Sequence, residues 1–223
     1  MKSVNIAIDG PSGAGKSTLA RKLAARLGYV YVDTGALYRA IAYDCITHKA
    51  ENEEQIIARL PEVNVSLDYI DGEQHVFVGG EDVSGCIRTA EVSMAASKVA
   101  AIPKVREFLF NLQQEMAKTH SVVMDGRDIG TVVLPNADVK IFLTASAEKR
   151  AERRYLELNE KQPGKQSYED VLADVIRRDE QDMNREIAPL KQAPDAELVD
   201  TTNADLAEAE EMLFRVCREK LGL

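Results

Sequence analysis

The chain has 223 residues, and its 28 Lys and Arg against 37 Asp and Glu give a formal net charge of −9. This charge argues against a protein that binds a nucleic-acid polymer, because such proteins present a basic surface. The composition, 45% hydrophobic and 29% charged, is that of a globular protein, and no apolar stretch approaches the ~20 residues of a membrane span.

The first part of the chain alternates between strand and helix patterns. Residues 4–8 are rich in β-branched side chains and predict a buried strand, and residues 16–27 repeat apolar side chains at helical spacing. Gly28 stands where a helix C-terminus favours a positive φ. A second strand over 30–32 and a helix over 36–47 complete a strand–helix–strand–helix order. This order predicts an α/β fold with a parallel sheet flanked by helices.

The middle of the chain departs from that order. Apolar residues alternate over 63–69, the pair Asp71-Gly72 is typical of a hairpin turn, and an apolar run returns over 75–78. We therefore predict a small antiparallel insert over about residues 60–85.

The remaining elements follow from the same two periodicities and from turn residues. Pro103 separates two predicted helices, because proline is tolerated at a helix start and disruptive inside one. Ser167, with Asp170 three residues later, predicts a capped helix start after the break at Gln162-Pro163-Gly164. In chain order, we predict helices over 91–101 and 105–118, strands over 121–124 and 139–143, a helix over 147–160, the capped helix, a strand near 198 and a helix over 206–220.

The segment between the first strand and the first helix fits the phosphate-binding pattern G-x-x-x-x-G-K-[ST]. It reads Gly10-Pro11-Ser12-Gly13-Ala14-Gly15-Lys16-Ser17. Glycines let successive backbone N–H groups point at phosphate oxygens, Lys16 is placed to reach the β- and γ-phosphates, and the Ser17 hydroxyl is placed to ligate Mg²⁺. The alternative, a purely structural turn, accounts poorly for the strand and helix on either side.

Polar residues also follow the second and third strands of the predicted parallel sheet. Asp33-Thr34-Gly35 leads to Arg39, and two interpretations stay open: ligand contacts at the sheet edge, or a helix N-cap followed by a solvated arginine. Asp125-Gly126-Arg127-Asp128 follows the third strand. Because an acidic residue after such a strand supplies the second Mg²⁺ contact in P-loop enzymes, we expect Asp125 to do so here.

Arginines are concentrated on the two helices before and after the break near residue 163. Arg178, Asp182 and Arg185 are spaced four and three apart, which places them on one helix face. The alternative is an exposed ion-pair ladder worth only ~0.2 to 0.5 kcal/mol per pair. Arg150 and Arg154 share a face one helix earlier, and the guanidinium fork suits phosphate.

With these motifs the chain resembles the bacterial cytidylate kinases, which are P-loop nucleoside monophosphate kinases, over essentially its whole length. The resemblance rests on Gly10–Ser17, Asp33–Arg39, Asp82-Val-Ser-Gly-Cys-Ile-Arg-Thr89, Ala96-Ser-Lys-Val-Ala-Ala101, Asp125-Gly-Arg-Asp-Ile-Gly-Thr131 and Arg178-Asp-Glu-Gln-Asp-Met-Asn-Arg185. It implies one P-loop kinase domain over 1–223, in which the antiparallel region belongs to a monophosphate-binding insert and residues about 150–165 form a short lid.

The resemblance also implies the roles of single residues. It implies that ATP is bound by Gly10, Pro11, Ser12, Gly13, Ala14, Gly15, Lys16, Ser17, Thr18, Arg150 and Arg154. It implies that cytosine is surrounded by Thr34, Arg106, Asp128 and Arg185, the sugar by Ser97, Arg178 and Asp182, and the acceptor phosphate by Arg39 and Arg127. Lys16, Arg39, Arg127, Arg178 and Arg185 are the expected catalytic residues. Some family members carry Ser in place of Thr34, and both residues offer a hydroxyl.

We therefore expect a Mg²⁺-dependent transfer of the ATP γ-phosphoryl group to CMP or dCMP, by a monomer in the cytoplasm. Cys45, Cys86 and Cys217 show no paired spacing, which fits a reducing compartment. One alternative is a kinase of another small acceptor, such as a different nucleoside monophosphate or shikimate. Another is a nucleotide-dependent switch, although no Asn-Lys-x-Asp element for reading guanine is present.

Overall fold

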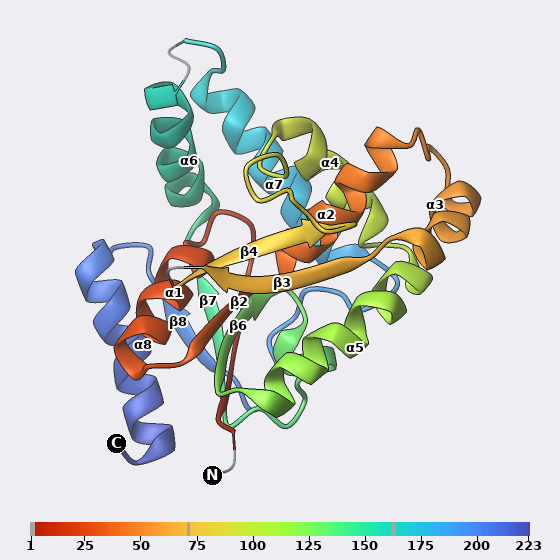
Figure 1. Ribbon diagram of the computed structural model, residues 1–223. Coiled ribbons are helices and arrows are strands. Elements are labelled where there is room, and N and C mark those ends of the chain that lie inside the picture. The colour runs from red at the N-terminus through yellow and green to blue at the C-terminus, as the bar shows by residue number, and fades with distance from the viewer. Residues whose placement is uncertain (1–2, 71, 162–163) are drawn as a thin grey trace. The chain divides into compact units, whose positions relative to one another are not determined.

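The structure is a computed structural model that describes residues 3–70, 72–161 and 164–223. The chain forms two compact units (Figure 1). The first unit contains the residues up to Tyr31 and those from His120 onward, and the second unit contains Val32–Thr119. Asp71, Gln162 and Pro163, which belong to the predicted hairpin turn and helix break, lie outside the described residues.

The sheet of the first unit has five strands in the order β2-β6-β1-β7-β8. The strand β1 pairs in parallel with β6 and β7, and β7 pairs in parallel with β8. The predicted α/β fold with a parallel sheet is therefore confirmed. The strands are β1 (Asn5–Asp9), β2 (Val30–Asp33), β6 (Val122–Gly126), β7 (Val139–Thr144) and β8 (Glu197–Asp200).

Helices α1 and α8 pack with the first unit's sheet in one core, in which Ile6, Leu23, Ile141 and Leu213 are fully buried. Helices α6 and α7 form a separate small cluster around Ala151. In this unit the helices are α1 (Lys16–Leu27), α6 (Ala147–Lys161), α7 (Tyr168–Asn184) and α8 (Leu206–Leu221), and a π-helical turn spans Ile129–Val133.

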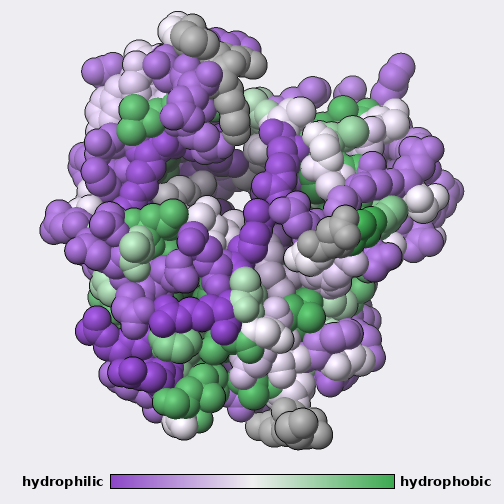
Figure 2. Space-filling view, turned by 60° about the vertical axis from the view of Figure 1, so that its left-hand side comes forward, coloured by the Kyte–Doolittle hydropathy of each residue, from purple (hydrophilic) through white to green (hydrophobic). Residues whose placement is uncertain are grey.

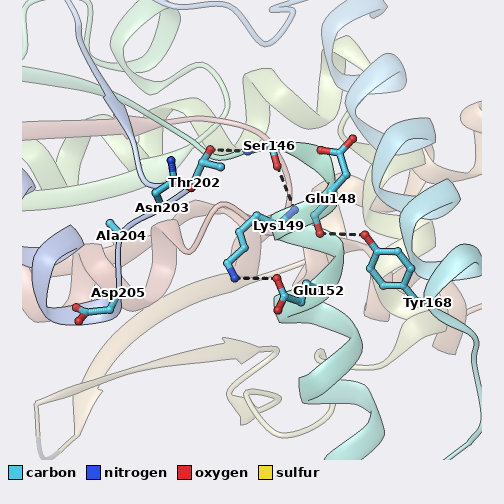
Figure 3. A pocket seen from close by; sticks show the side chains of 9 residues that line it. All are labelled: Ser146, Glu148, Lys149, Glu152, Tyr168, Thr202, Asn203, Ala204 and Asp205. Carbon is cyan, nitrogen blue, oxygen red and sulfur yellow. Dashed lines mark hydrogen bonds and ion pairs between the residues drawn. The ribbon is translucent and has the colours of Figure 1, made fainter.

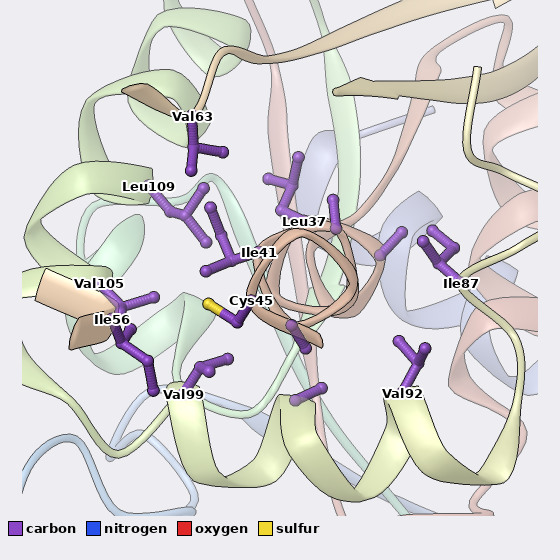
Figure 4. Close-up of a cluster of buried hydrophobic side chains, with 14 of the residues drawn as sticks. Leu37, Ile41, Cys45, Ile56, Val63, Ile87, Val92, Val99, Val105 and Leu109 are labelled. Carbon is purple, nitrogen blue, oxygen red and sulfur yellow. The ribbon is translucent and has the colours of Figure 1, made fainter. Parts of the chain in front are cut away.

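The second unit packs four helices with a three-stranded antiparallel sheet in the order β3-β4-β5. Its core surrounds α2, where Leu37, Ile41 and Cys45 are buried with Val105 and Leu109 (Figure 4). In chain order the elements are α2 (Thr34–Thr47), α3 (Glu53–Arg59), a 3₁₀ turn (Leu60–Glu62), β3 (Val65–Ile70), β4 (Glu73–Val78), β5 (Glu81–Asp82), α4 (Ala90–Val99) and α5 (Pro103–Thr119).

Residues on either side of the second unit are joined within the first. The backbone N–H of Val30 donates to the carbonyl of Ser121 over 2.9 Å. Val30 is the first residue of β2, just before the chain enters the second unit. Ser121 directly precedes β6, just after the chain has returned to the first unit.

Most predicted elements are confirmed within one or two residues at each end. Gly28 caps α1 with φ 70°, and Ser167 begins α7 in a reciprocal capping box with Asp170. Among the described residues, four elements were not predicted: α3, the 3₁₀ turn, β5 and the π-helical turn. Hydrophilic residues cover most of the face in Figure 2, and among the described residues no helix is long and apolar enough to span a membrane.

Candidate functional site

The glycine-rich segment connects β1 to α1 in the first unit, and its backbone needs glycine at Gly10, Gly13 and Gly15, which all have positive φ. A Cβ on Gly10 would lie 1.9 Å from the carbonyl oxygen of Leu143, so no side chain fits there. Gly15 is the N-cap of α1 and has φ 84°, in the left-handed region. Backbone N–H groups at a helix start are suited to bind an anion.

Lys16, the first residue of α1, is only 6% exposed. Its Nζ donates a hydrogen bond to the carbonyl oxygen of Pro11 over 2.7 Å. Burial, and then the positive charge of Arg127, lower the pKa of Lys16 to about 7. Bound phosphate oxygens would favour the charged form of this amine.

Ser17 and Asp125 meet as the sequence predicts. The Ser17 hydroxyl donates to Oδ2 of Asp125 over 3.0 Å, and the buried Tyr31 hydroxyl donates to Oδ1 over 2.9 Å. Two hard oxygen ligands next to a phosphate-binding loop fit Mg²⁺, which takes one or two protein ligands together with substrate phosphates and water. Among the described residues, no group of three or more His, Cys, Asp or Glu side chains is arranged to hold a metal ion.

The loop after β6 is tied to the end of α7 by two ion pairs. Nε of Arg127 donates to Oδ2 of Asp182 over 2.8 Å, and Nη2 of Arg185 lies 3.4 Å from Oδ1 of Asp128. Although burial acts against the charge, the Asp182 carboxylate raises the pKa of Arg127. The alternative of an exposed ladder along one helix is therefore wrong, since two of its members face another loop.

Arg185 lies just outside the helix on which it was predicted. The helix α7 ends at Asn184, and Arg185 has an extended backbone at its C-cap. Nε of Arg185 donates to the carbonyl of Ala188, and Ala188 has φ 50°, unusual for a residue with a side chain. The turn after α7, rather than the helix periodicity, thus directs this guanidinium toward Asp128.

Arg150 is buried, and each of its three guanidinium nitrogens donates a hydrogen bond. Nη1 donates to the carbonyl of Ser12 in the glycine-rich segment over 2.9 Å, Nη2 to Oδ2 of Asp179 over 2.6 Å, and Nε to the carbonyl of Ala145 over 2.8 Å. The arrangement fits a residue that supports the loop. Arg154, by contrast, has a side chain that is 42% exposed.

Arg178, also on α7, is half-buried and has a lowered pKa. Burial is the largest cause, followed by the neighbouring charges of Arg127 and Arg154. The carboxylates of Asp182 and Asp174 act in the opposite direction and favour the charged form of Arg178.

Asp9, the last residue of β1, was not singled out from the sequence. Its carboxylate accepts hydrogen bonds from the backbone N–H groups of Ile129 and Gly130 over 2.8 and 2.7 Å. Burial outweighs these bonds and raises the pKa of Asp9 to about 6. The sequence signal for Asp9 was present, since a carboxylate that ends a buried strand needs hydrogen-bond partners.

In the second unit, the Asp33 carboxylate accepts hydrogen bonds from both the start of α2 and Arg39. Its Oδ1 caps α2 by accepting from the N–H of Ala36, and its Oδ2 accepts from Nη2 of Arg39 over 2.8 Å. The helix-cap interpretation is therefore confirmed, but Arg39 is not a solvated side chain. Its buried Nε has no hydrogen-bond partner among the described residues, which is expected of a group that binds a ligand.

The other predicted residues of the second unit lie on its helices. Thr34 is buried at the start of α2. Ser97 lies on α4 and donates to the carbonyl of Ser93 over 3.4 Å. Arg106 lies on α5, where its guanidinium carbon is 5.7 Å from the centre of the Tyr38 ring.

A separate open pocket of about 730 Å³ lies in the first unit, between the start of α6 and the loop before α8. Figure 3 shows Thr202 bonded to the backbone of Ser146, and Lys149 paired with Glu152. The side chains that line this pocket are mostly polar. They are Ser146, Glu148, Lys149, Glu152, Tyr168, Thr202, Asn203, Ala204 and Asp205.

Comparisons with known proteins show the family of the chain. A family model described as cytidylate kinase matches residues 6–219. The cytidylate kinase of Caldicellulosiruptor bescii is 50% identical over 210 residues, covering 93% of this chain and 92% of that protein. The cytidylate kinase of Caldicellulosiruptor saccharolyticus is 47% identical over 224 residues, covering 100% and 99%.

Among solved structures, an uncharacterized protein from Eubacterium ventriosum aligns with a TM-score of 0.50 over 96% of this chain and 97% of that chain. At 14% identity, this likeness concerns the fold alone.

Proposed function

The chain belongs to the cytidylate kinase family, and from this premise we propose that it transfers the γ-phosphoryl group of ATP to CMP or dCMP. The observation that supports this reaction most directly lies in the first unit. There the parallel neighbours β1 and β6 end side by side, with Asp9 in register with Gly126. The phosphate-binding loop after β1 and the Asp125–Asp128 loop after β6 therefore begin at the same sheet edge, where open α/β sheets bind their ligands.

The donor is bound by the glycine-rich loop in this proposal. The backbone of residues 10–18 and the Lys16 amine contact the phosphates of ATP, and Arg154 approaches the same phosphates from α6. Arg150 acts differently from the sequence-based expectation, because its bonds to Ser12 and Asp179 use its donors to hold the loop. In this proposal Arg150 therefore stabilises the conformation of the loop and does not bind a phosphate of ATP directly.

Mg²⁺ is held by Ser17 and Asp125 in this proposal. When bound, this ion supplies positive charge next to the β- and γ-phosphates as negative charge spreads during transfer. Tyr31 fixes the Asp125 carboxyl group by its hydrogen bond to Oδ1. This bond leaves Oδ2, which contacts Ser17, oriented toward the loop.

The proposed acceptor contacts are given for each unit by itself. In the first unit, Arg127 binds the acceptor phosphate, and Arg178 and Asp182 contact the sugar. In the second unit, Arg39 also binds the phosphate, since its Nε lacks a hydrogen-bond partner among the described residues and Asp33 orients its guanidinium. The expected base contacts are Asp128 and Arg185 in the first unit and Thr34 and Arg106 in the second, and Ser97 adds a sugar contact.

The transfer needs few proton movements. An oxygen of the acceptor phosphate, already an anion at neutral pH, attacks the γ-phosphorus, and the bond from that phosphorus to the bridging oxygen of ADP breaks. No general base is required. Lys16 and the arginines then act by holding the two nucleotides in line and by stabilising the negative charge of the transferring group.

Base selectivity follows from Asp128. A carboxylate accepts a hydrogen bond from the exocyclic amine of cytosine, whereas UMP presents a carbonyl oxygen at that position. An unpaired buried polar group costs ~1 to 3 kcal/mol, so UMP is expected to be a poorer acceptor than CMP.

The test is an assay of ADP formation with ATP, Mg²⁺ and a panel of acceptors: CMP, dCMP, UMP, AMP, GMP and shikimate. We expect CMP and dCMP to react well, UMP less well and the others negligibly. Equal turnover of UMP and CMP at subsaturating concentration would contradict the role of Asp128. ADP formation that does not depend on any acceptor would favour a nucleotide-dependent switch.

Two further expectations belong to this proposal, a location in the cytoplasm and a monomeric state. The three free cysteines, Cys45, Cys86 and Cys217, support a reducing compartment. Light scattering on the purified protein measures the mass directly, to be compared with 24.6 kDa for one chain.

A further inference from the structure

We propose that Asp9 is a positioning residue that fixes the backbone directly after Arg127 and Asp128, and so holds these two side chains for the acceptor. The inference rests on the proposed function, because it assigns to Arg127 and Asp128 the contacts given above. Asp9 itself touches neither substrate in this account.

Asp9, on β1, acts as the cap of the π-helical turn that follows β6. Its Oδ1 accepts from the N–H of Ile129 and its Oδ2 from the N–H of Gly130. These residues begin the π-helical turn, whose own N-cap residue, Asp128, makes no side-chain cap bond. Only an ionised carboxylate offers two acceptor oxygens and no competing donor to a pair of N–H groups.

The surroundings leave the Asp9 carboxylate little freedom. Asp9 is 5% exposed, so water competes poorly for its oxygens. A Cβ on Gly130 would lie 3.3 Å from Oδ2 of Asp9 and 3.2 Å from Cδ of Lys140. Glycine at position 130 therefore allows the carboxylate to approach the backbone closely.

The position of Asp9 in the chain links the two loops of the first unit. Asp9 is followed at once by Gly10, the first residue of the glycine-rich loop. The residues that it caps come directly after Arg127 and Asp128. A displacement of about 1 Å in a reacting group can cost ~10²-fold in rate, so an unpinned backbone at this point is expected to slow transfer.

The first test is the variant Asp9→Asn. Its side-chain amide offers one acceptor oxygen and turns an NH₂ group toward the other backbone N–H. We expect faster hydrogen exchange at the amides of Ile129 and Gly130. We also expect kcat/KM for CMP to fall by more than about tenfold, with KM for ATP changed less than about threefold. A residue with a merely structural role would not separate the two substrates in this way.

The matched control is Asp138→Asn. Asp138 also accepts a backbone N–H with one oxygen, from Asn5 at the opposite end of β1, over 2.9 Å. We expect this variant to keep wild-type kinetics and wild-type exchange at Ile129 and Gly130.

A second variant, Gly130→Ala, keeps the carboxylate and pushes it away from its partner. We expect the same loss with CMP as in Asp9→Asn, and a double variant no slower than the slower single variant. This variant also tests the inference if Asp9→Asn does not fold. Wild-type exchange at both amides in Asp9→Asn, or equal losses for CMP and ATP, would overturn the inference. Failure of the wild-type protein to phosphorylate CMP would instead contradict the proposed function.

Discussion

Lys16 and the arginines of the site carry the same charge but have different hydrogen-bond partners. Lys16 is a buried amine that bonds to the backbone of its own loop, whereas Arg127 and Arg185 bond to carboxylates across from another element. Removing Lys16 therefore changes the charge within the loop, and removing an arginine also leaves a carboxylate without its partner.

We expect Lys16→Ala to lower turnover by orders of magnitude and to leave the fold intact, because the amine acts on charge that develops during transfer. Lys16→Arg should fail as well, since a planar guanidinium does not fit where Nζ lies 2.7 Å from Pro11 O. Steady-state kinetics together with a melting curve for each variant check this. Near-normal turnover of either variant would indicate that the glycine-rich segment is only a structural turn.

Arg185→Ala should cut kcat/KM for CMP by well over tenfold, because tenfold corresponds to ~1.4 kcal/mol and losing a charged hydrogen bond typically costs more. The matched control is Arg177→Ala on α7, whose side chain is 61% exposed and pairs with Asp174. That variant should lose under ~0.5 kcal/mol of stability and no activity. Equal kinetics in the two variants would leave Arg185 without a role in acceptor binding.

The residues of the site could be predicted to different degrees. The contact between Ser17 and Asp125 was predictable, because the glycine-rich segment and the polar residues from Asp125 onward follow neighbouring parallel strands. The orientation of Arg185 was not, since it depends on a left-handed residue at Ala188 that no local pattern announces. Nor was the burial of Arg150, which a helix-face pattern cannot distinguish from exposure.

At the scale of elements, the short strand β5 is fastened to β4 by the Asp82 carboxylate. Oδ1 of Asp82 accepts from the N–H of Ser84 over 2.9 Å, and Oδ2 lies 2.7 Å from Nδ1 of His75. The hydrogen bonds from Ser84, and next that from His75, lower the pKa of Asp82 to about 2.

Because the pKa of Asp82 is lower in the folded protein than in the unfolded chain, the carboxylate stabilises the fold above about pH 4, and this contribution disappears as the pH falls through about 2. We expect Ser84→Ala to raise the pKa of Asp82. An NMR titration of the Asp82 carboxyl carbon measures this value in wild type and variant. Because the backbone N–H at position 84 remains in the variant, an unchanged titration curve would show that the Ser84 hydroxyl is not the main cause.

The elements that were missed were hidden for two physical reasons. The strand β5 has two residues and the helix α3 has seven, so neither is long enough to show a period. The π-helical turn depends on Asp9, which lies 120 residues away in sequence from Ile129. Long elements with one buried face, such as α1 and α8, were predictable from apolar spacing alone.

At the scale of the whole molecule, one buried cysteine lies in each unit. Burial raises the pKa of Cys45 in the second unit to about 11 and that of Cys217 in the first unit to about 12, whereas Cys86 is exposed. A thiol reagent at neutral pH should therefore modify Cys86 at once, and the other two only when their own units open.

Mass spectrometry of digested protein over a time course of labelling measures each rate separately. Equal slow rates at Cys45 and Cys217 would indicate that the two units open together, and unequal rates would indicate that they open independently. Rapid labelling of either residue in the native protein would contradict its burial.

The hydrogen bond between Val30 and Ser121 bears on whether the second unit can be removed or exchanged. It brings together the two points between which the second unit departs from the first and returns to it. The entropic cost of closing a loop comes from bringing its two ends together, and it grows only slowly with the length of the loop. A minimal chain in which a short linker replaces Val32–Thr119 would therefore close on a junction that is already formed. Replacing the second unit in this way keeps the glycine-rich loop and strands β6, β1, β7 and β8, and shortens β2 to Val30 and Tyr31.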